Sequence, residues 1–107
     1  GMGPGFISPN LDRTLIDDIL TIDLDDAERE CQRLAREEGI LVGQSSGAAS
    51  LAARQVAKRV SDPSATCPEP PTAMSDGGSD RCPLVLTVFW DSGERYLSAG
   101  TFERNTN

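Results

Sequence analysis

The sequence predicts an α/β fold, a β-α-α-β piece in which two helices connect two parallel strands. Three observations support this prediction. Apolar residues recur at helical spacing over residues 24–35. An alanine-rich run over residues 46–60 contains no proline and favours a second helix. Residues 84–90 (LVLTVFW) are apolar, β-branched and aromatic, which is typical of an inner strand of a parallel sheet.

The composition limits both the size and the partners of the protein. A chain of 107 residues fits one domain, and 17 acidic against 10 basic residues give a net charge of −7. This charge argues against nucleic acids and anionic membranes as partners, because both are negatively charged. No apolar stretch reaches membrane-spanning length. Three cysteines are too few for a disulfide scaffold, so we expect a reducing, cytoplasmic location.

The first helix has clear signals at both ends. Residues 15–22 are expected to form a short strand, and Asp23 then resembles a helix N-cap. One buried stripe is predicted from Leu24, Ala27, Cys31, Leu34 and Ala35. The charged residues outside it, Glu28, Arg29, Glu30, Arg33 and Arg36, are expected on a solvated face. Gly39 supplies the left-handed residue that ends the helix.

The second helix is expected from Ser46 to about Val60, deeply buried in its first half. Residues 61–83 are rich in Pro, Ser, Gly, Thr and Asp and are interpreted as a disordered or loosely held insertion. Cys67 and Cys82 could meet across it, but free thiols are the expected state. Residues 91–96 are expected to form a turn that runs into a short helix.

Candidate chemistry is concentrated at the start of the second helix. Residues 43–47 (GQSSG) match the Gly-x-Ser-x-Gly pattern of serine hydrolases, but that pattern needs a histidine base and the chain has none. Two interpretations remain. The serines are simply helix caps, or a hydroxyl and free backbone N–H groups hold an electron-rich ligand atom. No spacing resembles a metal site, and Lys58 is expected to be an ordinary surface lysine.

Three stretches carry a family resemblance. They are residues 1–7 (GMGPGFI) followed by 10–11 (NL), then 33–49 (RLAREEGILVGQSSGAA) and 91–98 (DSGERYLS). In this order they resemble the closing part of cysteine synthase (O-acetylserine sulfhydrylase), in the cystathionine β-synthase group of fold-type II pyridoxal-phosphate enzymes. The resemblance covers residues 1–60 and 84–102. It implies that the whole chain, 1–107, is the C-terminal part of a parallel-sheet enzyme domain.

The resemblance also implies a cofactor and a reaction. The cofactor is pyridoxal 5'-phosphate, the substrate is a small amino acid, and the parent reaction converts O-acetylserine and sulfide to cysteine and acetate. Ser45 would donate a hydrogen bond to the pyridine nitrogen of the cofactor, and Gly3 and Gly5 would line the substrate side. A neutral hydroxyl at the positive end of a helix opposes protonation of that nitrogen. The weaker electron sink that results suits elimination of acetate and addition of sulfide.

The chain departs from the family in several places. Trp90 stands where the family commonly has proline, and the part of the insertion from Cys67 to Pro83 occupies a normally short connection between helix and strand. The Schiff-base lysine and the phosphate-binding loop match no part of the chain, so we expect no catalytic residue, no activity and no bound cofactor in the chain alone. The SGERYLS run favours sulfide over homocysteine as the parent's nucleophile. The alternative is a non-catalytic fragment that docks with a complementary chain or self-associates, as a homodimer or higher oligomer, through exposed apolar faces.

Overall fold

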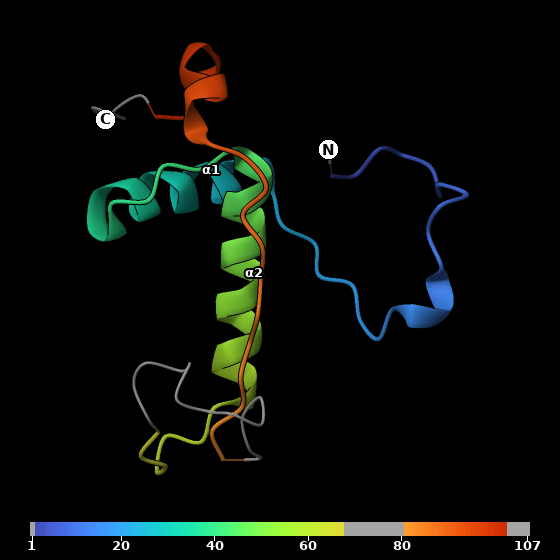
Figure 1. Ribbon diagram of the computed structural model, residues 1–107, viewed down its shortest axis with the longest axis vertical. Helices are drawn as coiled ribbons and strands as arrows, with labels where there is room; N and C mark the ends of the chain where they lie inside the picture. Colours follow the sequence, from blue (N-terminus) through green and yellow to red (C-terminus); the bar gives the residue numbers. More distant parts are fainter. Residues whose placement is uncertain (1, 68–80, 103–107) are drawn as a thin grey trace.

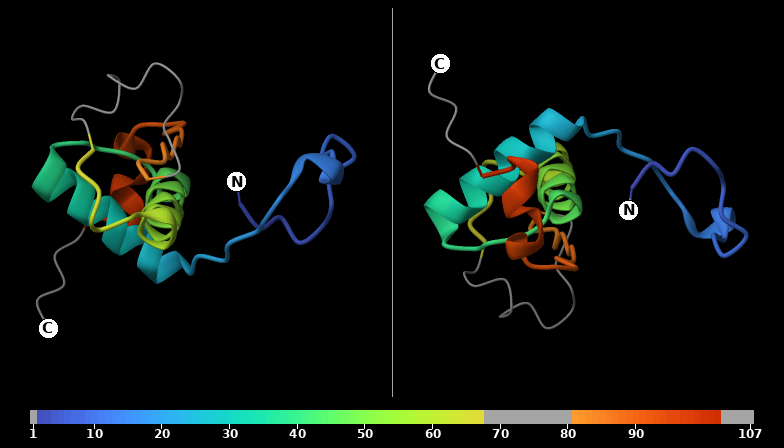
Figure 2. Two further views of the ribbon diagram at one scale, coloured as in Figure 1. Left: turned by 90° about the horizontal axis from the view of Figure 1, so that it is seen from below. Right: turned by 90° about the horizontal axis from the view of Figure 1, so that it is seen from above.

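The computed structural model describes residues 2–67 and 81–102. In chain order, its elements are the 3-10 helix η1 (Arg13–Leu15), α1 (Leu24–Arg33), the π-helical η2 (Leu34–Glu38), α2 (Gln44–Val60) and the 3-10 helix η4 (Gly93–Ala99). Helix α1 lies across the N-terminal end of α2, and the segment before α1 extends away from both helices (Figures 1 and 2). No helix within the described ranges is long and apolar enough to cross a membrane.

Helix α1 follows the periodicity of its sequence. Asp23 occupies the N-cap with extended backbone angles, although its side chain makes no capping hydrogen bond. The predicted stripe is confirmed at Ala27, Cys31 and Leu34, which are all buried. Leu24 is 60% exposed and was wrongly placed in the stripe, because the contact with α2 is centred one turn later. Through η2 the helical run continues to Gly39, which is left-handed (φ 69°, ψ 24°) as predicted.

Helix α2 begins at Gln44, two residues before the predicted start, with Gly43 as its N-cap. Its first half is buried, as predicted, because α1 packs directly on it. Gly47 lies at the crossing, where an added Cβ atom would come within 2.4 Å of the Ala27 carbonyl oxygen and 2.5 Å of Cys31 Sγ. Only glycine therefore lets the two helices approach this closely.

Neither predicted strand forms a ladder within the described ranges. Residues 15–22 begin in η1 and continue as irregular chain, and residues 84–90 run alongside α2 without a partner strand (Figure 1). Pairing in these ranges is limited to isolated bridges, one of which joins Val42 to Ser92 in antiparallel sense. A strand needs the backbone groups of a neighbour, and the described residues supply none. The parallel-sheet class therefore stays a prediction.

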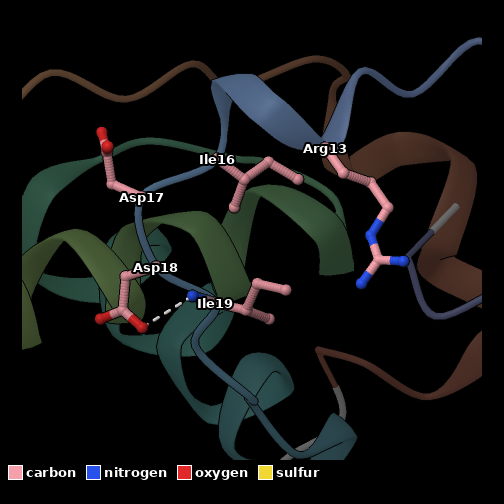
Figure 3. Close-up of a pocket in the computed structure, with 5 residues that line it drawn as sticks. All are labelled: Arg13, Ile16, Asp17, Asp18 and Ile19. Carbon is pink, nitrogen blue, oxygen red and sulfur yellow. Dashed lines mark hydrogen bonds between the residues drawn. The ribbon is translucent and has the colours of Figure 1, made fainter.

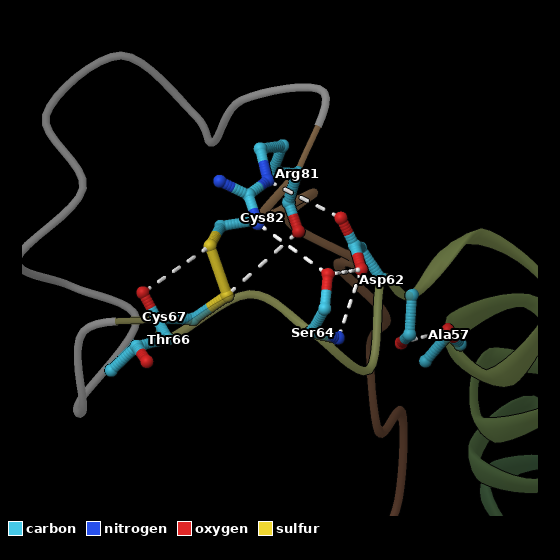
Figure 4. Close-up of a disulfide and its surroundings, with 8 residues drawn as sticks. Ala57, Asp62, Ser64, Thr66, Cys67, Arg81 and Cys82 are labelled. Carbon is cyan, nitrogen blue, oxygen red and sulfur yellow. Dashed lines mark hydrogen bonds and ion pairs between the residues drawn. A yellow bond between two sulfur atoms is a disulfide. The ribbon is translucent and has the colours of Figure 1, made fainter.

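The expectation of free thiols at Cys67 and Cys82 is wrong, because these cysteines form a disulfide (Figure 4). An ion pair between Arg81 Nε and Asp62 Oδ2, 3.2 Å apart, holds together the two arms that carry the cysteines. Most of the predicted insertion, residues 68–80, lies outside the described residues. Cys31 remains a free, buried thiol.

Candidate functional site

The first turn of α2 contains the predicted ligand-binding residues. Its first helical hydrogen bond runs from the Gly47 N–H to the Gly43 carbonyl oxygen, at 3.0 Å. The N–H groups of Gln44, Ser45 and Ser46 precede this bond and so have no acceptor within the helix. Since α2 is 17 residues long, its dipole adds partial positive charge at the same place.

Ser45 is half-buried in this turn. Within the described part of the chain its hydroxyl has no hydrogen-bond partner. The interpretation of the serines as helix caps is wrong, because Gly43 occupies the cap position and no side chain caps the helix. The Ser45 hydroxyl is therefore left without a structural role that would explain it.

Ser46 differs from its neighbour. It is fully buried, and its hydroxyl oxygen accepts a hydrogen bond from the Trp90 backbone N–H at 3.1 Å. This bond fastens the end of the 84–90 segment to the first turn of α2. The Ser46 hydroxyl thus has a structural partner, whereas the hydroxyl of the adjacent Ser45 has none among the described residues.

A polar network fixes the first residue of α2. The side-chain amide of Gln44 donates to Glu28 Oε1 at 2.8 Å and to the Thr101 hydroxyl at 3.1 Å. Gln32 donates to the Thr101 carbonyl oxygen at 2.7 Å, and Thr101 is fully buried. Sequence reasoning missed this network. The available signal was the i, i+4 spacing of Glu28 and Gln32, which forms a polar stripe beside the apolar one.

The other side of this turn is packed around Gly43. An added Cβ atom there would lie 2.4 Å from the Tyr96 ring and 2.5 Å from Asp91 Oδ1, so the position requires glycine. The Cys31 thiol donates to the Gly43 carbonyl oxygen at 3.2 Å, and burial raises the pKa of this thiol, which keeps it protonated as a donor. The Tyr96 hydroxyl donates to Asp91 Oδ2, and this bond raises the pKa of the phenol.

Glu30 clamps α1 to α2. It was expected on the solvated face of α1, and that expectation is wrong, since its side chain is only 3% exposed. Its carboxylate accepts two hydrogen bonds from Arg33, at 2.9 and 2.8 Å, one from Ser50 at 2.8 Å and one from Arg54 at 2.8 Å. These donors, led by Arg33, hold the pKa of Glu30 at about 2. Residue 30 lies at the border of the apolar stripe, where α2 covers it.

The structure does not bring Gly3 and Gly5 to the first turn of α2. Both have left-handed backbone angles (φ 60° and 83°) and lie in the N-terminal segment, which extends away from the two helices (Figure 2). A shallow hollow in the same segment is lined by Arg13, Ile16, Asp17, Asp18 and Ile19 and contains no predicted site residue (Figure 3). Among residues 2–67 and 81–102, no group of three or more His, Cys, Asp or Glu side chains is placed to hold a metal ion.

Known proteins resemble this chain over most of its length, although no family model matches it. A probable cysteine synthase from Bacillus subtilis is 43% identical over 98 residues, which are 92% of this chain and 25% of the relative. A cysteine synthase from Haemophilus influenzae is 41% identical over 103 residues, or 96% of this chain and 27% of the relative. The chain resembles the C-terminal part of a cysteine synthase. The resemblance predicted from the three stretches is thereby confirmed.

The cysteine synthase relatives are much longer than this chain, which spans about a quarter of their length. A Streptomyces lavendulae protein named O-ureido-L-serine synthase is 35% identical over 103 residues, which are 96% of this chain and 26% of that protein. This chain is therefore similar both to proteins named cysteine synthase and to one named O-ureido-L-serine synthase.

Proposed function

We propose that this chain is part of a pyridoxal-phosphate-dependent cysteine synthase, a cytoplasmic transferase of cysteine biosynthesis. The complete enzyme converts O-acetylserine and sulfide to cysteine and acetate. Ser45 binds the pyridine nitrogen of the cofactor, and Gly3 and Gly5 line the substrate side. The single observation that supports this role best is the half-buried Ser45 hydroxyl, which has no partner among the described residues although its neighbours are all engaged.

The chemistry of the first turn of α2 fits this cofactor. The pyridine ring of pyridoxal phosphate withdraws electrons from the bound amino acid when the cofactor is in place. An unprotonated ring nitrogen has a lone pair that accepts one hydrogen bond, and the Ser45 hydroxyl can donate one. The positive end of α2 disfavours protonation of that nitrogen. Ser45 therefore keeps the ring in its weaker electron-withdrawing form.

The surroundings of Ser45 support a fixed position for its hydroxyl. Gln44 before it is bonded to Glu28 and Thr101, and Ser46 after it is bonded to Trp90. A donor whose position is set before the ligand arrives loses little freedom on binding. The residues on both sides of Ser45 are therefore held in place, and its hydroxyl is available to a ligand from a fixed position.

The role of Ser45 is tested in an enzyme that joins this chain to the lysine-bearing part of the fold. Ser45→Ala removes the donor, and we expect turnover to fall about tenfold, the equivalent of one hydrogen bond of roughly 1.4 kcal/mol. Ser45→Thr keeps a hydroxyl and should restore most of the rate. The 15N chemical shift of the labelled cofactor ring should move in Ser45→Ala and not in Ser98→Ala, the control at an exposed serine. An unchanged ring shift in Ser45→Ala would refute the role.

The chain alone is expected to be inactive. Its single lysine, Lys58, lies near the C-terminal end of α2, in the last turn, far along the helix from Ser45. After incubation with pyridoxal phosphate and borohydride, mass spectrometry should find no stoichiometric adduct on this lysine. Added O-acetylserine and sulfide should give no enzymatic cysteine. A stoichiometric adduct accompanied by turnover would contradict this part of the proposal.

The alternative is a non-catalytic fragment that self-associates or docks with a complementary chain. It is supported by large apolar side chains on the surface, among which Leu86, Leu15 and Ile19 are 88%, 78% and 77% exposed. Exposed apolar surface of this kind commonly marks an interface. Light scattering at increasing concentration tests this alternative. A mass that stays at one chain of 11.4 kDa would count against self-association.

A further inference from the structure

The disulfide between Cys67 and Cys82 joins two arms of chain at the end of α2 that is remote from Ser45 (Figures 1 and 4). The first arm, residues 61–67, continues from the C-terminal end of α2, and the second, residues 81–83, leads into residues 84–90. The arms also meet through the Arg81–Asp62 ion pair and a 3.5 Å hydrogen bond from Arg81 to the Ser64 hydroxyl. Both are exposed, and exposed contacts of this kind contribute little. The covalent bond therefore provides most of the closure.

Residues 84–90 run back along α2 from the disulfide to the first turn of the helix (Figures 1 and 2). Within the described ranges, residues 84–89 make no hydrogen bond, and Leu86 is 88% exposed. The hydrogen bond that fixes the segment comes at its far end, where the Trp90 N–H donates to Ser46. The segment is thus held at two places, by the disulfide at one end and by Ser46 at the other.

We propose that the Cys67–Cys82 disulfide is a redox-sensitive clasp that holds residues 84–90 alongside α2. Cys67 is exposed, so a thiol in solution can reach the bond. A dithiol reductant transfers two electrons and two protons to the S–S bond, which gives two thiols, while the dithiol itself becomes a cyclic disulfide. After reduction the segment keeps its anchor at Ser46 and loses the covalent link at its other end, where non-covalent contacts such as the Arg81–Asp62 ion pair remain. This proposal stands independently of the role of Ser45.

The clasp makes a local prediction that a general loss of stability would not produce. Opening the disulfide removes the covalent link at one end of residues 84–90, so the segment should move more freely and subtilisin should cut within residues 84–89 about ten times faster. Cleavage within α1 should change little, because α1 packs on the other end of α2. Trp90 is the only tryptophan, so its fluorescence reports the anchored end of the segment.

The experiment compares the full chain under oxidising conditions, the chain reduced with dithiothreitol, and the double variant Cys67→Ser/Cys82→Ser. Thiol titration in denaturant should count one thiol in the oxidised chain and three in the reduced chain, since Cys31 is free in both. The rate at which subtilisin cuts within residues 84–89, followed by mass spectrometry, should rise on reduction and fall again on reoxidation. The double variant should match the reduced chain and should not respond to dithiothreitol.

Three results would overturn the clasp. The first is three thiols in the chain before any reductant is added. The second is an equal rate of subtilisin cleavage within residues 84–89 in both redox states. The third is a rise in cleavage of the same size throughout α1 and α2, which would show a general stabilising bond instead of a local one. Reversible reduction of the unmodified chain decides the question even where the double variant does not fold.

Discussion

Replacing Glu30 by glutamine removes the charge from the buried carboxylate that clamps α1 to α2. In the folded chain four hydrogen bonds from Arg33, Ser50 and Arg54 stabilise the ionised form and lower its pKa from 4.5 to about 2. A shift of this size corresponds to roughly 3 kcal/mol of stability at neutral pH. We expect Glu30→Gln to lower the free energy of unfolding at pH 7 by about that amount, which is a large fraction of the stability of a small domain.

The pH dependence gives this prediction its sharpest test. Because the folded-state pKa is lowered, the contribution of Glu30 is complete above pH 4.5 and is lost as the pH falls towards 2. About 2 kcal/mol of it should be lost by pH 3. The difference in stability between the unmodified chain and Glu30→Gln should therefore shrink as the pH falls from 7 to 3.

Urea unfolding followed by circular dichroism at each pH measures this difference. Glu37→Gln is the matched control, since Glu37 also pairs with Arg33, at 3.3 Å, but is 60% exposed. An exposed pair contributes about 0.5 kcal/mol, so this variant should change little. A loss in Glu30→Gln that is equally large at pH 7 and pH 3 would show that packing, and not charge, explains it, and the reasoning would fail.

Two further predictions concern the first turn of α2 and its surroundings. Gly47→Ala would place a methyl group 2.4 Å from the Ala27 carbonyl oxygen and should lower the urea midpoint by the equivalent of about 2 kcal/mol, whereas Gly39→Ala, at a left-handed position in open space, should cost only about 1 kcal/mol. Tyr96 is the only tyrosine, so absorbance at 295 nm reports its ionisation alone, which should require a higher pH than in the unfolded chain. Asp91→Asn should lower the pKa of this phenol, and an unchanged titration would contradict the hydrogen bond between the two side chains.

The helices could be predicted because their signals are local. The spacing of Ala27, Cys31 and Leu34 defines the buried side of α1, and the left-handed glycine at 39 ends the helical run. The run of alanines in α2 likewise determines a helix from neighbours in the chain. These signals depend on residues a few positions apart, which a single sequence displays directly.

Contacts between distant residues could not be predicted in the same way. Glu30 reads as a surface residue from its own helix, and its burial depends on Ser50 and Arg54, which are 20 and 24 positions away. The candidate site shows the same limit. The sequence placed two serines at the start of a helix, but the partner that distinguishes Ser46 from Ser45 is Trp90, which lies 44 positions from Ser46.

The 84–90 segment shows how composition and context can disagree. Its residues have the character of an inner strand, yet it runs alongside α2 with Leu86 88% exposed. The composition shows that these side chains would fit a buried sheet. A hydrogen-bonded β-ladder, however, forms only where a second strand lies beside the first. Within the described residues that neighbour is missing, so the segment stays extended and unpaired.

Thr101, near the end of the described chain, helps to hold the first turn of α2 in place. This residue binds Gln32 in α1 and Gln44 at the start of α2, 69 and 57 positions earlier. Replacing Thr101 by alanine would take one of its two acceptors from the Gln44 side chain, which would then keep Glu28 alone. The turn that carries Ser45 would thereby lose part of its support through a change made far from it in sequence.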